Sequence, residues 1–358
     1  MDINILLTTG GTGGHIFPAL AVAEEIRRRY PQARLLFVGS LYGPEARLAR
    51  VANIPFEGLP VRGFLGRGLK SVEAGICMAW GVGRAVGIVR RFRPDVVAGF
   101  GSYAAFAPML AGRMLGVPIM LHEQNAIAGA SNRVLARLAQ RICLSLPDTR
   151  GFDPARCVLT GNPVRAGVSE AGRLPRARGA RRLLVMGGSQ GAHALNMFIV
   201  EHLSAFKAAG VDIRHQTGVA DEQNVRDAYV AAGYEASTVT AFIDDMAAAY
   251  AWADVALCRS GATTVAELCA AGLPSVLVPF PYAVHDHQTR NAEILAQGGA
   301  AILVPEPRMI EENLAQTLID LLNDGSERTR MSAAALAAAR PDAASRVVSV
   351  LEEIARLR

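Results

Sequence analysis

Short apolar runs alternate with longer amphipathic segments along most of the chain. Short apolar runs are typical of buried parallel strands, because such strands are covered on both faces. The runs are NILLTT (4–9), RLLFVG (34–39), DVVAGF (95–100), PIMLHE (118–123), RICLSL (141–146), RLLVMG (182–187), DIRHQT (212–217), DVALCR (254–259), PSVLVPF (274–280) and AAILVP (300–305). Segments with helical spacing, such as 17–30 and 262–272, lie between many of them. This alternation predicts an α/β protein whose parallel sheets are covered by helices.

The opening of the chain has a counterpart about half the chain later. GGTGG (10–14) and GGSQG (187–191) both follow a strand and precede a helix. We therefore expect two Rossmann-like doubly wound domains, residues 1–161 with 340–358 and residues 162–339. The Arg-, Gly- and Pro-rich stretch 171–182 is expected to connect them. The closing helix, 343–358, has no strand after it, so its pattern alone is compatible with packing on either domain.

Charge is unevenly distributed between the two halves. Residues 1–161 carry 19 Lys and Arg against 10 Asp and Glu, whereas residues 162–339 carry 14 and 19. A basic half attracts an anionic partner such as an acidic lipid surface or a phosphorylated substrate, although it can equally be a solvated surface. Nucleic acid is not expected, because the arginines are not interleaved with aromatic residues and no binding motif occurs.

Several features favour a cytoplasmic protein that does not span the membrane. The five cysteines are scattered, without disulfide or zinc spacing. Acidic Asp2 precedes a strand, and no apolar stretch follows a basic one, so no signal peptide is expected. The longest uncharged runs, 96–112 and 268–284, contain Gly and Pro and are shorter than a membrane-spanning helix.

A glycine turn that leads into a helix exposes backbone N–H groups at the positive end of the helix dipole, which favours an anionic ligand. Close packing of the strand and the helix would also explain the glycines. The Walker A motif is absent, and neither loop has the G-x-G-x-x-G spacing of dinucleotide sites. The second strand also has no carboxylate at its end before Glu45, so NAD is not expected.

A carboxylate with suitable spacing occurs in CRSGATTVAEL (258–268), where a small-residue turn precedes a helix. Glu267 could accept both hydroxyls of a ribose while the helix start faces phosphate, or it could serve only as a cap or a surface residue. The histidines His285 and His287 flank Asp286, but no further ligands follow, so no metal site is predicted. The sequence contains no D-x-D pair, so a metal-bridged diphosphate is not expected either.

As a set, these segments resemble the MurG family of N-acetylglucosaminyltransferases. The resemblance runs from about residue 5 to residue 340 and rests on GGTGGHIFPALAVA, GFGSYAAFAP, HEQN (122–125), GNPVR, GGSQGAHALN, FIDDM, RSGATTVAEL, GLPSVLVPFP and HQTRNA. It implies a GT-B fold, in which two Rossmann-like domains face a deep cleft, and no metal or other cofactor. It also implies transfer of GlcNAc from UDP-GlcNAc to a polyprenyl-diphosphate-linked muramyl pentapeptide, converting lipid I to lipid II at the cytoplasmic face of the membrane. Ser102 and Ala105 depart from the usual family pattern.

The resemblance also implies roles for individual residues. By the resemblance, Ile243 would contact the uridine and Glu267 the ribose. The diphosphate would be bound by the helix start 262–264 with Ser189 and Arg165. The sugar falls to Gln288 and Asn125. The full set implied to bind the donor is Thr12, Gly13, Gly14, Asn125, Arg165, Ser189, Ile243, Ala262, Thr263, Thr264, Val265, Ala266, Glu267 and Gln288.

The implied reaction is an inverting single displacement, which needs a base for the muramyl 4-hydroxyl. His15 is the first candidate, because histidine titrates near working pH, and Glu123 is the second. His15 could instead only hydrogen-bond a substrate oxygen. Segment 61–94 mixes apolar and basic residues and is expected to contact the membrane, although an ordinary core helix fits nearly as well. Two other functions fit the same domains: a UDP-GlcNAc 2-epimerase and a non-catalytic sugar-nucleotide-binding protein.

Overall fold

The computed structural model describes residues 3–61, 70–147, 149–174, 179–283 and 286–356. The chain divides into two compact units. The first unit is Met1–Val164 together with Asp342–Arg358, and the second is Arg165–Pro341. The expected boundaries, after residues 161 and 339, lie a few residues before these.

The first unit contains a seven-stranded parallel sheet with the strand order β3-β2-β1-β4-β5-β6-β7. The strands are β1 (Asn4–Thr8), β2 (Arg34–Ser40), β3 (Phe56–Leu59), β4 (Val96–Gly99), β5 (Ile119–Glu123), β6 (Arg141–Leu144) and β7 (Cys157–Leu159). The helices are α1 (Gly13–Arg29), α2 (Glu45–Val51), α3 (Lys70–Phe92), α4 (Phe106–Met114), α5 (Ala130–Leu135) and α14 (Ala343–Arg356), with 3₁₀ turns η1 (Tyr103–Ala105) and η2 (Pro154–Arg156). The strand order reverses between β1 and β4, which is where ligands bind in open α/β sheets.

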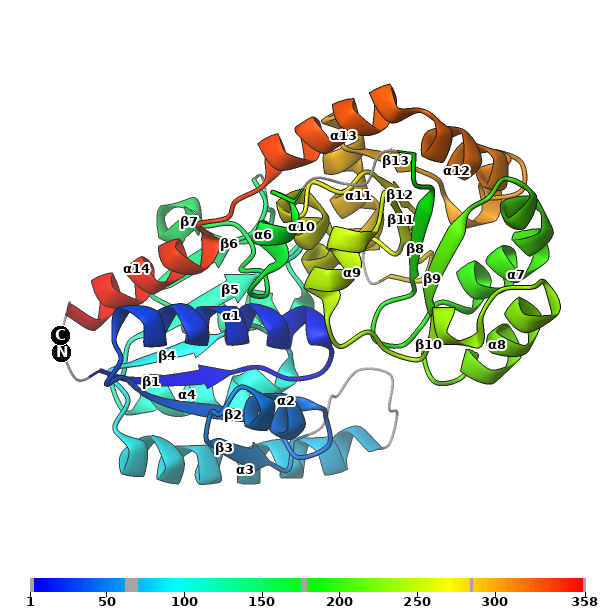
Figure 1. Cartoon of the computed structure of the whole chain (residues 1–358). Coiled ribbons are helices and arrows are strands. Elements are labelled where there is room, and N and C mark those ends of the chain that lie inside the picture. Colours follow the sequence, from blue (N-terminus) through cyan, green and yellow to red (C-terminus); the bar gives the residue numbers. More distant parts are fainter. Residues whose placement is uncertain (1–2, 62–69, 148, 175–178, 284–285, 357–358) are drawn as a thin grey trace. The chain divides into compact units, whose positions relative to one another are not determined.

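The apolar strands of the first unit supply two separate cores, one on each face of the sheet. Leu6 of β1 belongs to the cluster beneath α3 and α4, whereas Ile5 and Leu7 belong to the cluster that contains α1 and α14. Successive side chains point to opposite faces of a strand, so an apolar run supplies both clusters. Helix α14 lies beside α1, as Figure 1 shows, and Arg29 pairs with Glu352 at 3.0 Å. The closing helix therefore packs on the first unit.

The second unit contains a six-stranded parallel sheet with the strand order β10-β9-β8-β11-β12-β13. The strands are β8 (Arg182–Met186), β9 (Asp212–Gln216), β10 (Val239–Thr240), β11 (Val255–Cys258), β12 (Ser275–Leu277) and β13 (Ala301–Leu303). The helices are α6 (Val168–Ala171), α7 (His193–Ala208), α8 (Glu222–Ala231), α9 (Met246–Trp252), α10 (Ala262–Ala270), α11 (His287–Gln297), α12 (Leu314–Asn323) and α13 (Gly325–Ala338), with 3₁₀ turns η3 (Ala236–Thr238) and η5 (Glu306–Arg308).

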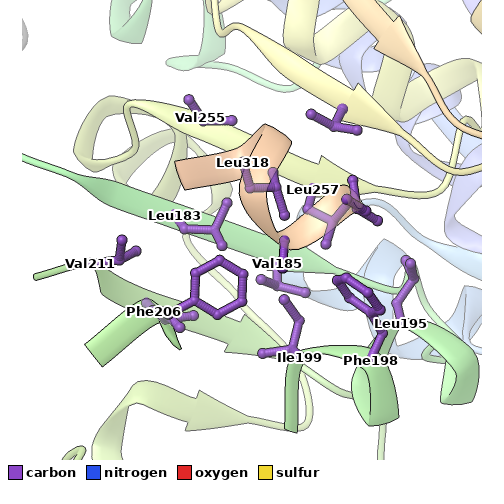
Figure 2. Close-up of a cluster of buried hydrophobic side chains, with 14 of the residues drawn as sticks. Leu183, Val185, Leu195, Phe198, Ile199, Phe206, Val211, Val255, Leu257 and Leu318 are labelled. Carbon is purple, nitrogen blue, oxygen red and sulfur yellow. The ribbon is translucent and has the colours of Figure 1, made fainter. Parts of the chain in front are cut away.

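One face of the second sheet packs against α7, α8 and α12. Figure 2 shows Leu183 and Val185 of β8 meeting Ile199 and Phe206 of α7, with Leu318 of α12 beside them. The predicted fold class, two Rossmann-like doubly wound parallel-sheet domains, is confirmed.

The prediction for the connecting segment was wrong. The chain passes into the second unit at Arg165, upstream of the expected stretch 171–182. Helix α6 packs against α9 and α10 and thereby belongs to the second unit. Residues 175–178 of the expected connection lie outside the described residues. The composition of a loop alone does not show which side of a boundary its neighbours pack on.

Candidate active site

The first glycine loop leads from β1 directly into α1. Gly11 has a φ of +87°, which favours glycine, and a Cβ at Gly10 would lie 2.6 Å from both Ala104 Cβ and Glu45 Oε1. The backbone N–H of Gly11 donates to Glu45 Oε1 over 2.9 Å. Glu45 is fully buried at the first position of α2, and burial raises the pKa of its carboxyl. The sequence analysis named Glu45 only in arguing against a dinucleotide site, and it did not predict this bond to the glycine loop.

The predicted donor residues of this loop form the start of α1. Thr12 is the N-cap and is exposed, its hydroxyl makes no capping bond, and Gly13 and Gly14 are the first two helical residues. The helix begins four residues before the segment with helical spacing, so His15 lies in its first turn and donates its backbone N–H to Thr12 O. The positive end of the helix dipole therefore lies at the switch point of the first sheet.

His15 contacts the HEQN segment, which follows β5. His15 Nδ1 lies 2.9 Å from Gln124 Oε1. The Gln124 amide nitrogen lies 3.0 Å from Phe100 O and 3.1 Å from His122 Nδ1, and His122 Nε2 lies 3.1 Å from Gly161 O. The structure thus joins the first candidate base to a buried chain of polar groups. Of these groups, Gln124 and His122 were visible in the motif but were given no role.

Glu123, the second candidate base, is 1% exposed, and its carboxylate is surrounded by donors. Oε1 accepts from the backbone N–H of Asn125 at 2.9 Å and from its side-chain amide at 3.3 Å. Oε2 accepts from Asn132 Nδ2 at 2.8 Å and from Gly129 N at 3.2 Å. The four contacts fix loop 125–129, and with it Asn125, at the carboxyl end of β5. This geometry favours a positioning role over proton transfer.

The second glycine loop, 187–191, leaves Ser189 exposed between β8 and α7. Gly191 has a φ of +78°, and a Cβ there would lie 2.1 Å from Thr217 O. Close backbone approach therefore explains that glycine. Anion binding remains the proposed explanation for the exposed tip of the loop, because Ser189 is exposed and precedes the start of α7.

A further helix start of the second unit is that of α10. Its N-cap, Gly261, supplies no side-chain cap, and the helix begins at Ala262. Ser260 Oγ donates to Gln288 O over 2.8 Å, and Asn291 Nδ2 donates to Ser260 O over 3.2 Å. These bonds, which the sequence reasoning did not anticipate, bring Gln288 next to the α10 start.

The remaining predicted residues of α10 differ in what they expose. Thr264 and Ala266 are half-buried, whereas Ala262, Thr263 and Val265 are buried, and the backbone N–H of Val265 already donates to Gly261 O over 2.9 Å. Gln288 Oε1 accepts from Phe280 N over 3.0 Å, and its amide nitrogen has no partner within the described part of the chain. That nitrogen is available as a donor to a ligand.

Arg165 and Glu267, predicted to bind the diphosphate and the ribose, form a bidentate ion pair. Arg165 Nε and Nη2 each lie 2.7 Å from a Glu267 oxygen, and the Tyr250 hydroxyl donates to Oε2 over 3.0 Å. The side chain of Glu267 is 2% exposed and that of Arg165 is 22% exposed. Burial raises the pKa of Tyr250 well above its usual range, so its hydroxyl keeps its proton. Each of these two groups is thus the main charged partner of the other.

Ile243 lies in the loop between β10 and α9 and lines a cavity of about 880 Å³. Asp245 ends this loop and caps α9 by accepting from Ala248 N over 2.9 Å. Tyr250, which contacts Glu267, lies on the same helix, so α9 links the Ile243 loop to the ion pair. His285 lies outside the described residues. Among the residues described, no three His, Cys, Asp or Glu side chains gather as a metal site, and no helix is long and apolar enough to span a membrane.

Both units match known protein families. The glycosyltransferase family 28 N-terminal domain matches residues 5–144, and the family 28 C-terminal domain matches residues 182–347. The UDP-N-acetylglucosamine–N-acetylmuramyl-(pentapeptide) pyrophosphoryl-undecaprenol N-acetylglucosamine transferase of Nitratidesulfovibrio vulgaris strain DP4 is 54% identical over 354 residues, which is 98% of this chain and 97% of the relative. The transferase of the same name from Lawsonia intracellularis is 46% identical over 99% of this chain and 98% of its own length.

Solved structures agree with these matches. The crystal structure of Acinetobacter baumannii MurG superposes with a TM-score of 0.76 at 33% identity, covering 98% of this chain and all of that one. A UDP-N-acetylglucosamine 2-epimerase superposes with a TM-score of 0.68, but at 16% identity, so this similarity concerns the fold alone. The chain therefore belongs to the MurG family and carries its two family 28 glycosyltransferase domains on a GT-B fold.

Proposed function

We propose that this protein transfers GlcNAc from UDP-GlcNAc to the muramyl 4-hydroxyl of undecaprenyl-diphospho-MurNAc-pentapeptide, converting lipid I to lipid II in peptidoglycan synthesis. The observation that carries this proposal is the full-length match to the Nitratidesulfovibrio transferase. In the reaction the acceptor oxygen bonds to C1 of GlcNAc, the bond from C1 to UDP breaks with inversion, and UDP leaves with the electron pair.

His15 is the proposed base that receives the hydroxyl proton. His15 Nε2 makes no hydrogen bond within the described part of the chain, whereas both oxygens of Glu123 are occupied by loop donors. Glu123 is accordingly assigned to holding Asn125 in place. The start of α10 and the loop at Ser189, both in the second unit, would stabilise the charge that develops on the leaving diphosphate.

The proposed donor contacts require the ion pair between Arg165 and Glu267 to be exchanged. The diphosphate would take over Arg165, and the ribose hydroxyls would take over Glu267. Each group would then exchange one charged or polar partner for another, which avoids leaving a buried charge without a partner. Gln288 would donate its free amide to the sugar, and the backbone of Ile243 would meet the uracil.

The test is release of UDP from UDP-GlcNAc, with and without a lipid I analogue, in EDTA. Release that requires the acceptor and persists in EDTA supports the proposal. Formation of the manno isomer without acceptor would instead indicate the epimerase, and donor binding without release would indicate a non-catalytic protein. His15→Ala is expected to lower kcat by about 100-fold or more. Near-normal turnover of that variant would exclude its role as the base.

The first unit is also proposed to contact an anionic membrane surface at the cytoplasmic face. Trp80 of α3 is 64% exposed, and Met114 at the end of α4 is 63% exposed. A cavity of about 420 Å³ is lined by four arginines, of which Arg113 and Arg137 have no ion-pair partner within the described part of the chain. Exposed apolar side chains together with arginines that have no ion-pair partner in the described part of the chain fit an acidic interface. Residues 62–69 of the segment expected to contact the membrane lie outside the described residues.

This surface can be tested by sedimentation with vesicles. The protein should sediment with phosphatidylglycerol vesicles and much less with phosphatidylcholine vesicles. Trp80→Ser combined with Arg113→Glu should weaken that binding, whereas Val230→Ser, at an exposed apolar position of the second unit, should not. Equal binding by both variants would place the membrane contact elsewhere.

A further inference from the structure

The polar chain behind His15 is anchored on backbone carbonyls, and carbonyls can only accept hydrogen bonds. His122 Nε2 lies 3.1 Å from Gly161 O, so this nitrogen must carry a hydrogen. His122 is fully buried, and burial, with a smaller contribution from nearby His15, lowers its pKa to about 4. The ring is therefore neutral near pH 7, and its Nδ1 carries a lone pair.

The orientation of the Gln124 side-chain amide follows from the same matching of donors with acceptors. One of its amide atoms lies 3.0 Å from Phe100 O and 3.1 Å from His122 Nδ1, and both of these are acceptors. That atom must be the NH₂ group, and the other must be the carbonyl oxygen. A flipped amide would place oxygen against both acceptors inside a site where Gln124 is 1% exposed. The amide orientation is thus set by the groups around it.

The same matching of donors with acceptors shows which ring nitrogen of His15 carries the hydrogen. Its Nδ1 lies 2.9 Å from Gln124 Oε1, which can only accept, so Nδ1 must carry the hydrogen. We propose that Gln124 and His122 are positioning residues that hold His15 as the Nδ1–H tautomer, which leaves the Nε2 lone pair open to receive the acceptor's proton. This inference rests on the proposed role of His15 as the base.

The arrangement also prepares His15 for the charged state. When Nε2 takes the proton from the muramyl hydroxyl, the imidazolium keeps its Nδ1–H bond to the Gln124 carbonyl, which becomes a charge-assisted bond. None of the hydrogen bonds that join His15, Gln124 and His122 has to reverse its direction during this step. Three parts of the first sheet set the orientation of the Gln124 amide and the His122 ring. Phe100 follows β4, His122 lies in β5, and Gly161 lies in the loop after β7.

The tautomer can be read directly by long-range ¹H–¹⁵N correlation spectra of the full chain labelled with [¹⁵N]histidine, recorded near pH 8. His15→Gln identifies the His15 signals. We expect the Nδ1–H pattern at His15 and the Nε2–H pattern at His122. An Nε2–H pattern at His15 in the unaltered protein would overturn the proposal. Because this readout does not depend on turnover, it separates failure of the tautomer model from failure of the proposed reaction.

Two variants test the kinetic consequence. Gln124→Met should lower kcat by about 10- to 100-fold, because the productive tautomer is no longer favoured, with the KM for UDP-GlcNAc within about twofold. Gln124→Glu places a carboxylate next to the imidazolium, so the acid limb of the pH–rate profile should move to higher pH. A loss of kcat with an unmoved acid limb in Gln124→Glu would indicate a merely structural role and overturn the proposal. Gln223→Met, at an exposed position of α8, is the matched control.

Discussion

Removing Arg165 should destabilise the second unit strongly, because it leaves Glu267 charged and almost fully buried. The carboxylate is 2% exposed, and Arg165 supplies two of its three hydrogen bonds. Breaking a buried ion pair from one side costs about 3–5 kcal/mol. With a urea dependence of about 2 kcal/mol per molar, Arg165→Met should lower the unfolding midpoint by about 1.5–2.5 M.

Removing Glu267 instead of Arg165 should lower the free energy of unfolding by less. In Glu267→Met the guanidinium of Arg165 is 22% exposed and can turn to water, so a loss of about 1–2 kcal/mol is expected. The double variant contains no unpaired charge, and its loss should be smaller than the sum of the two single losses by about 1–3 kcal/mol.

The chain offers a specific probe for this experiment. It has two tryptophans, Trp80 in the first unit and Trp252 in the second. In a Trp80→Phe background, tryptophan fluorescence reports unfolding of the second unit alone. Arg226→Met, which removes a half-exposed ion pair with Glu222 on α8, is the control and should shift the midpoint by less than about 0.5 M. Additive losses from the two ion-pair variants, or a negligible effect of Arg165→Met, would refute the reasoning.

Three further outcomes follow from the structure. Glu45→Ala should lower kcat/KM more than it lowers stability, because the first glycine loop loses its buried anchor; unchanged kinetics in the UDP-release assay would contradict this. Gly191→Ala should unfold at lower temperature by calorimetry, because its Cβ would lie 2.1 Å from Thr217 O at a φ of +78°; an unchanged Tm would contradict it. Burial lowers the pKa of His122 to about 4 and that of His215 to about 3, below the unfolded value of about 6.5. The stability that depends on these neutral histidines is therefore expected to be fully present above about pH 6.5 and to fall as the pH drops toward their folded-state pKa values. In Tm measurements across pH, His215→Gln should reduce this decline. A flat Tm between about pH 7 and pH 4 would contradict the expectation.

The alternation of apolar runs predicted ten of the thirteen strands in the described part of the chain, because strands buried on both faces are apolar throughout. The edge strands β3, β7 and β10 were not among the predicted runs. The repeat of the glycine loops was sufficient to predict two units, and each loop does lie between the first strand of its sheet and a helix. The position of α14 was not predictable from pattern, because its apolar stripe fits any apolar surface of matching shape. In the structure its apolar side chains join the cluster around α1, and Arg29 and Tyr30 both contact Glu352.

The site was predictable where a motif carries it and not where packing decides it. Glu267 was singled out from its motif as a possible ribose ligand, but only the structure shows that Arg165 and Tyr250 bond to it. Glu45 lay outside any motif, and its importance comes from burial against the glycine loop. Gln124 was part of a quoted motif, but its role depends on two carbonyls distant in sequence. Hydrogen-bond partners at long sequence separation leave no periodic signal in the chain.

The return of α14 to the first unit has a consequence for how the protein is made. The second unit is one continuous segment, Arg165–Pro341, so all of it is translated before α14. The first unit begins earlier but is finished last, because Val347 and Leu351 of α14 complete the apolar cluster around α1. During synthesis, the unit that is translated first therefore depends on a helix that is translated after the whole of the second unit. Truncation near the C-terminus should therefore damage the N-terminal sheet.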